Sequence, residues 1–164
     1  MDFPPYLLTS YSAVRQQCEQ NVREYYKKSV LLRNDDHFEI QFKEIFDHMA
    51  ALYGLDDMQK DQLMQWEIEG ELEAVIPLVP QISLLKKYIA EGNDIVLISD
   101  MYLPKEVIVK LLQKADPLLA TLPLYVSSEV GHQKTTRKLF LHVYSEIIPS
   151  LKVISRSTNL RSFK

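Results

Sequence analysis

Residues 94–104 read Asp94-Ile-Val-Leu-Ile-Ser-Asp-Met-Tyr-Leu-Pro104, and the fold follows from this stretch. The apolar run at 95–98 is short and rich in β-branched residues, with Gly92-Asn93 before it and Ser99-Asp100 after it. Such a run between turn residues is typical of a buried strand in a parallel sheet. Pro104 suits the start of a helix, where its missing N–H is not needed. The stretch therefore predicts a strand, a polar turn and a helix.

The residues that follow repeat this alternation. We expect the first helix to continue through Leu112, a second strand at Leu124–Val126, a helix from about Lys134 to Ile148, and a third strand from Leu151 to Ile154. Strands and helices at this spacing form βαβ units with right-handed crossovers. The predicted fold class is α/β, with a partial Rossmann-like parallel sheet.

The residues before position 94 have helical spacing. Apolar residues recur every three or four positions, which predicts helices over about 12–32, 40–54, 57–74 and 82–92. Ser12 is the expected N-cap of the first helix, and Gly54 the expected end of the second. The predicted organisation is an all-helical domain at 1–80, a partial α/β core at 81–155 and a basic tail at 156–164.

Composition excludes several classes of protein. The 164 residues carry a net charge of -3, so a broad cationic surface for nucleic acid or anionic membrane is not expected. Cys18 is the single cysteine and cannot form an internal disulfide, and we expect it to pack within a helix. No apolar run approaches the roughly 20 residues that span a bilayer, and residues 1–10 lack the features of a signal peptide. We expect a cytoplasmic protein.

The polar residues after the first predicted strand are candidates for ligand binding. In open parallel sheets the ligand lies beyond the carboxyl ends of the strands, where Ser99 and Asp100 are expected. A hydroxyl there, followed by the N–H groups of a helix start, could hold a phosphate. The alternative is that Ser99 and Asp100 form an ordinary turn or cap.

The segment Gly131-His-Gln-Lys134 is expected at the start of the next helix. A lysine in the first turn opposes the helix dipole, which favours an anionic partner, although a solvated surface lysine is the alternative. His132 has no acid or nucleophile at a defined spacing, so we interpret it as a loop residue. Ser99, Asp100 and Lys134 are thus the predicted phosphate-binding residues.

Residues 94–104, together with Val126-Ser-Ser-Glu-Val-Gly-His-Gln-Lys134, resemble the haloacid dehalogenase superfamily, in particular its hydrolase-like domains found beside bacterial glycosyltransferases. The resemblance implies that Ser99 supplies a hydroxyl to a phosphoryl group and that Lys134 offsets its charge. It also implies that residues 3–80 form a helical cap, with Glu67-Ile-Glu-Gly-Glu71 before the return to the core. Apart from the resemblance, those acids indicate a solvated helix face.

The sequence departs from this family in two places. The family uses a nucleophilic aspartate at the end of a first strand, with Mg²⁺ to offset charge. Here the chain begins directly at the cap, and Asp2 does not fit that role. Acidic magnesium ligands are also missing from residues 153–161, and no aspartate follows Asp116. We therefore expect a truncated domain without a complete catalytic set, in which Mg²⁺ binding is not retained.

Two functions follow from these observations. The first is a phosphate-binding remnant of a phosphohydrolase, acting on a small phosphorylated metabolite or descended from enzymes that do, and inactive alone. The second is a non-catalytic interaction module that self-associates or docks on a glycosyltransferase-linked polypeptide, because a sheet without its first strand exposes edges and apolar surface. A third hypothesis is that these residues have structural roles alone, in a helical domain with a small α/β appendage.

Overall fold

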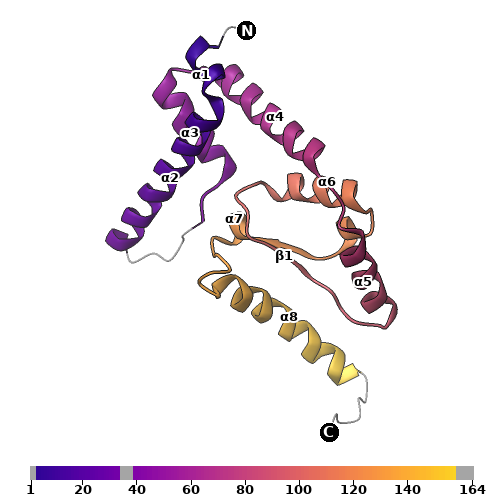
Figure 1. The fold of residues 1–164 in the computed structure, drawn as a ribbon. Coiled ribbons are helices and arrows are strands. Elements are labelled where there is room, and N and C mark those ends of the chain that lie inside the picture. The colour runs from indigo at the N-terminus through magenta and orange to yellow at the C-terminus, as the bar shows by residue number, and fades with distance from the viewer. Residues whose placement is uncertain (1–2, 34–38, 158–164) are drawn as a thin grey trace.

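The computed structural model describes residues 3–33 and 39–157, which form a largely helical fold with a small parallel sheet. Figure 1 shows α1, α2 and α3 grouped at one end, with α4 leading from them toward α5 and α6, and α8 beyond the sheet. In chain order the elements are α1 (Pro5–Thr9), α2 (Tyr11–Arg33), α3 (Phe42–Tyr53), α4 (Asp57–Ala74), α5 (Val79–Ala90), β1 (Leu97–Ser99), α6 (Lys105–Ala115), η1 (Leu119–Thr121), β2 (Leu124–Val126), α7 (Ser127–Val130) and α8 (Lys138–Ser157).

The helices of the first half end where local chemistry places their caps. Gly54 ends α3 in the left-handed region at φ 65°, which confirms its predicted role. Asp56 opens α4 because its carboxylate accepts from the Gln59 N–H at 2.8 Å. The N-cap prediction for Ser12 is wrong. Helix α2 already begins at Tyr11, directly after α1, and the carbonyl of Ser10 accepts from the Val14 N–H at 3.0 Å.

The two strands pair in parallel, with Leu97 opposite Leu124 and Ser99 opposite Val126. Helix α6 joins them, and the parallel βαβ arrangement and the second strand are as predicted. The first strand begins two residues later than predicted, at Leu97. Its N–H donates to the Pro123 carbonyl at 2.8 Å, and Pro123 has no N–H to extend the ladder toward residue 95.

Helix α8 corrects two predictions. The third strand is wrong, because residues 151–154 lie within α8, which runs from Lys138 to Ser157. The apolar positions 139, 143, 147 and 151 continue one helical period, and a short apolar run alone does not distinguish strand from helix. The helix also starts four residues after Lys134, beyond a turn where Arg137 has φ 63°. Lys134 is therefore not in a first helical turn, and the dipole argument for it is wrong.

The basic tail predicted for 156–164 lies outside the described residues from position 158 onward. Positions 156 and 157 belong to the end of α8.

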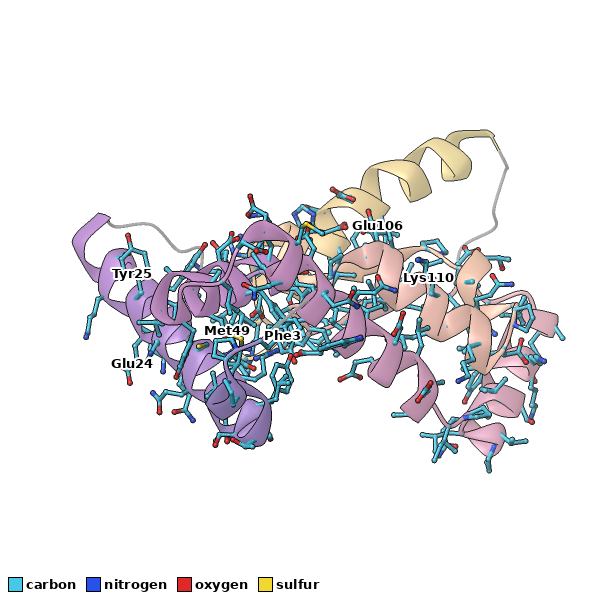
Figure 2. All side chains as sticks on the ribbon, turned by 90° about the horizontal axis from the view of Figure 1, so that it is seen from above. Phe3, Glu24, Tyr25, Met49, Glu106 and Lys110 are labelled. Atoms are coloured by element: carbon cyan, nitrogen blue, oxygen red, sulfur yellow. The ribbon has the colours of Figure 1, made fainter. Side chains whose placement is uncertain are left out.

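One buried apolar cluster joins the helical first half to the α/β part. Cys18 belongs to it at 1% exposure, as expected from its predicted packing, and burial raises the pKa of its thiol. Figure 2 shows Met49 in the interior of the helical group, with Glu24 and Tyr25 on its outer side. Residues on both sides of position 80 therefore share one core. Its buried members are Leu7, Cys18, Val22, Ile40, Phe42, Ile45, Phe46, Met49, Leu63, Leu103, Val107, Ile108, Leu124 and Val126.

Helix α5 is packed differently from the rest. None of its residues is buried, although Ile82, Leu85 and Ile89 are partly covered. A salt bridge of 2.6 Å joins Lys86 on α5 to Asp116 at the end of α6. Among the described residues, no helix is both long enough and apolar enough to cross a membrane.

The shared core predicts a large difference between two methionines. Met49 is fully buried, so Met49→Ala should lower the free energy of unfolding by about 2–5 kcal/mol through lost apolar contact and a residual cavity. Met58 is 70% exposed on α4, so Met58→Ala should change it by no more than about 0.5 kcal/mol. Urea unfolding followed by circular dichroism measures both values. Equal effects would contradict the placement of Met49 in the core.

Candidate functional site

Two segments far apart in sequence meet at the carboxyl end of β1. Asp100 follows Ser99, the last residue of the strand, and its Oδ1 accepts from the backbone N–H of Lys134 at 3.2 Å. This hydrogen bond brings two of the predicted site residues, Asp100 and Lys134, into contact. Ser99 is the neighbour of Asp100 in the chain. We call the segments containing Ser99, Asp100 and Lys134 the rim of the sheet.

Two polar groups at the rim are available to a ligand. The Ser99 hydroxyl makes no hydrogen bond to another described residue, and no described carboxylate lies within 4.0 Å of the Lys134 ammonium. The Asp100 carboxylate contacts the backbone of Lys134. A carboxylate repels phosphate, so Asp100 can serve phosphate binding only by holding the Lys134 backbone in place.

His132 lies in the loop between α7 and Lys134, as predicted, but no sequence pattern indicated its surroundings. Its Nδ1 is buried and has no hydrogen-bond partner among the described residues. A buried polar atom without a partner carries a free-energy cost. The loop that presents Lys134 thus also contains an unsatisfied imidazole nitrogen.

The hydroxyls at the end of β2 are used within the protein. Ser127 donates to the Met101 carbonyl at 3.2 Å, and Ser128 donates to the Leu103 carbonyl at 3.1 Å. Both serines are buried. They hold the loop between β1 and α6 against β2, so we assign them to positioning the rim and not to ligand binding.

The same loop is anchored to the helical first half through Tyr102. The Tyr102 carbonyl accepts a hydrogen bond from the Phe42 N–H at 2.9 Å. The rings of Tyr102 and Phe42 are nearly parallel, with an interplanar angle of 5° and 6.3 Å between their centroids. The Arg15 guanidinium lies 5.1 Å from the centre of the Tyr102 ring. Burial raises the pKa of the Tyr102 hydroxyl, although Arg15 acts in the opposite direction.

Arg15 is the centre of a buried polar cluster. Its side chain is 9% exposed and donates twice to Glu67, with Nε at 2.8 Å and Nη2 at 2.7 Å. Glu19 accepts a further bond at 3.0 Å, and the Tyr11 hydroxyl donates to Glu67 at 3.1 Å. Burial lowers the pKa of Arg15, but hydrogen bonds and the charge of Glu67 outweigh it, so that pKa is raised. The pKa of Tyr11 is also raised, by burial and then by Glu67.

This cluster corrects the interpretation of the acidic segment 67–71 as a solvated face. Glu67 is turned inward to Arg15, while Glu69 is exposed to solvent. The sequence could not distinguish these acids, because the partner of Glu67 is 52 residues away.

The rim does not fit the Mg²⁺ that the family resemblance implies. A hard cation of this kind takes several oxygen ligands, whereas the rim offers the Asp100 carboxylate, one of whose oxygens accepts from Lys134. Across the described part of the chain, no group of three histidine, cysteine, aspartate or glutamate residues is placed to hold a metal ion.

Comparisons with known proteins found neither a family model nor a curated protein sequence that matches this chain. The resemblance to the haloacid dehalogenase superfamily stays a prediction from the two quoted strings.

The buried pair makes a stability prediction. Glu67→Gln removes the more buried of the two carboxylates that contact Arg15, so the free energy of unfolding should fall by roughly 1.5–3 kcal/mol. Glu73→Gln, at an exposed position on the same helix, should change it by about 0.5 kcal/mol or less. Urea unfolding of both variants measures the difference. The double variant Arg15→Met with Glu67→Leu should recover much of the lost stability, because it removes both members of the buried charge pair. An unchanged free energy of unfolding in Glu67→Gln, or no recovery in the double variant, would contradict the buried pairing of Arg15 with Glu67.

Proposed function

We propose that this protein binds a small phosphorylated metabolite at the rim formed by Ser99, Asp100 and Lys134, and does not hydrolyse it alone. The observation that carries the proposal is the hydrogen bond from the Lys134 N–H to Asp100. It supports the expectation that the residue with the positive charge and the residue with the hydroxyl belong to the same end of the sheet.

The chemistry of the rim suits a phosphate group. The Lys134 ammonium supplies a compact positive charge with three donors, and the Ser99 hydroxyl supplies one more donor. Hydrogen bonds to charged groups are stronger than those between neutral groups, so a phosphate would gain more from this pair than a neutral ligand would.

Hydrolysis of a phosphate ester requires groups that Ser99 and Lys134 do not supply. It needs an activated nucleophile together with charge offset at the transferred phosphoryl group. Ser99 has no hydrogen-bonded base among the described residues, and the rim does not fit Mg²⁺. Descent from a phosphohydrolase of the haloacid dehalogenase type is part of this proposal and rests on the sequence resemblance.

Binding can be tested with inorganic phosphate and a hexose 6-phosphate by isothermal titration calorimetry. Lys134→Ala should weaken binding about tenfold or more through loss of a charged hydrogen bond, and Ser99→Ala should weaken it by a few fold. Lys110→Ala, at an exposed position on α6 (Figure 2), is the matched control and should bind as the parent does. Equal affinity in all variants would place the ligand elsewhere.

Asp100→Asn gives an independent test of the rim. The amide oxygen can still accept from the Lys134 N–H, while the negative charge beside the ligand is removed, so phosphate should bind a few fold more tightly at low salt. Calorimetry at low and high ionic strength measures the gain. Steady release of phosphate with added Mg²⁺ that persists in Ser99→Ala and Lys134→Ala would contradict both the site and the absence of turnover.

A second candidate function is self-association. Exposed large apolar side chains follow one another closely in two segments, before and along α5 and on α8: Ile76, Leu78, Val79, Leu84 and Tyr88, then Phe140, Leu141 and Tyr144. Others are exposed singly on the first four helices. Side chains of this size exposed over neighbouring turns are a common property of protein interfaces.

Sedimentation velocity over a wide concentration range tests this candidate. A dimer that dissociates on dilution, and that is weakened by Ile76→Ser or Leu141→Ser, would support association through one of these surfaces. Glu106→Ser, on the exposed face of α6, is the control that should leave the profile unchanged. A monomer at every concentration would exclude this function.

A further inference from the structure

A groove runs along one side of β2. It encloses about 520 Å³, and its floor is formed by the four consecutive residues 123–126. Lys105 at the start of α6 and Glu129 on α7 line it, as do His142 and Glu146 on α8. No residue of β1 lines it, and β1 pairs with the other edge of β2. The groove therefore follows the free edge of β2.

The register of the sheet determines which backbone groups face this groove. In a parallel ladder, alternate residues of a strand bond to the same neighbour. Tyr125 stands opposite Ile98 and bonds toward β1, so the N–H and carbonyl of Leu124 face the free edge. Leu124 keeps 7% exposure there, whereas Val126 is fully buried and its N–H is covered. In the part of the chain that the structure describes, no strand pairs with that edge. Unpaired groups of this kind are a template for an added strand.

Side chains hold the floor of the groove in place from both faces of the sheet. Leu124 and Val126 are buried in the shared core with Val107 and Ile108 of α6. Tyr125 faces α8, where its ring meets His142 edge-on at 6.4 Å between centroids. Because the edge of β2 is already ordered, a strand could pair with it without a conformational change, which lowers the entropic cost of binding.

The charges in the groove favour a basic partner. Glu129 and Glu146 project from different helices, with side chains 44% and 52% exposed. The Lys105 ammonium is a distant 3.9 Å from Glu129, and Glu146 contacts the His142 ring at 3.2 Å. With histidine counted as neutral, the groove carries two negative charges and one positive charge. A lysine or arginine on the added strand would offset this excess.

We propose that the groove binds an extended, basic peptide segment of another protein, which adds to the free edge of β2. Four residues form the floor, so at about 3.3 Å per residue a segment of roughly four to six residues fills it. The peptide lies across β2 from β1, and Ser99, Asp100 and Lys134 do not line the groove. The inference therefore does not depend on the proposed phosphate binding.

The experiment is a titration of the ¹⁵N-labelled full chain with the acetylated and amidated peptide Thr-Lys-Val-Lys-Thr. The amide signal of Leu124 should shift, and its hydrogen exchange should slow in the complex. The same peptide N-methylated at its three central residues keeps its charge but loses its donors, and it should bind at least about tenfold more weakly. The acidic counterpart Thr-Glu-Val-Glu-Thr should not bind.

Variants of the protein separate the charge from the strand edge. Glu129→Gln and Glu146→Gln should each weaken the basic peptide about two- to fivefold, as expected for partly exposed charge pairs. Glu106→Gln lies outside the groove and should have no effect. Absence of shifts at millimolar peptide, shifts confined to Leu97–Ser99, or equal binding of the N-methylated peptide would each overturn the proposal.

Discussion

The buried guanidinium of Arg15 contacts three segments that lie far apart in the sequence: α2, α4 and the loop after β1. It bonds to Glu67 across α2 and α4 and lies over the ring of Tyr102, which belongs to the loop after β1. Removing two charges from water is costly, and a buried pair of this kind contributes little net stability over apolar residues of similar size. Its value lies in geometry, because Arg15 and Glu67 compensate each other in one relative position of the helices. The loop that follows Ser99 is fixed against the helical half by the same arrangement.

The loop that follows Ser99 is also held by contacts from the α/β part of the protein. Ser127 and Ser128 hold its carbonyls, and Asp100 holds the backbone of Lys134. Each of these bonds joins residues at least 25 positions apart, so the site is assembled by tertiary contacts alone. The groups left over, the Ser99 hydroxyl and the Lys134 ammonium, are those that suit an anion. The buried Nδ1 of His132, in the same loop as Lys134, is the polar atom of this region that the described scaffold leaves unsatisfied.

Sequence patterns predicted the elements that local chemistry determines. Gly54 ends α3 and α4 begins at Asp57, both as predicted, and the apolar runs at 95–98 and 124–126 indicated a parallel pair, which the structure forms over 97–99 and 124–126. Prediction failed where two periods overlap, as at residues 151–154, whose apolar residues suit either a strand or the continuation of α8. The predicted position of Lys134 in the first turn of a helix was also wrong, because a turn at Arg137 precedes α8, which begins at Lys138. The inward position of Glu67 depends on a distant arginine, and no pattern near residue 67 reveals it.

The packing of α5 has a consequence for how the molecule opens. A helix with no buried residue, tied to α6 through the exposed Lys86 and the Asp116 carboxylate, gains little free energy from its neighbours. Local opening follows the distribution of buried apolar contact. Residues 79–90 should therefore detach and reattach while the core around Phe46 stays closed, so that the folded ensemble contains a minor species with α5 released. The native state of this protein is accordingly expected to have at least two levels of cooperativity.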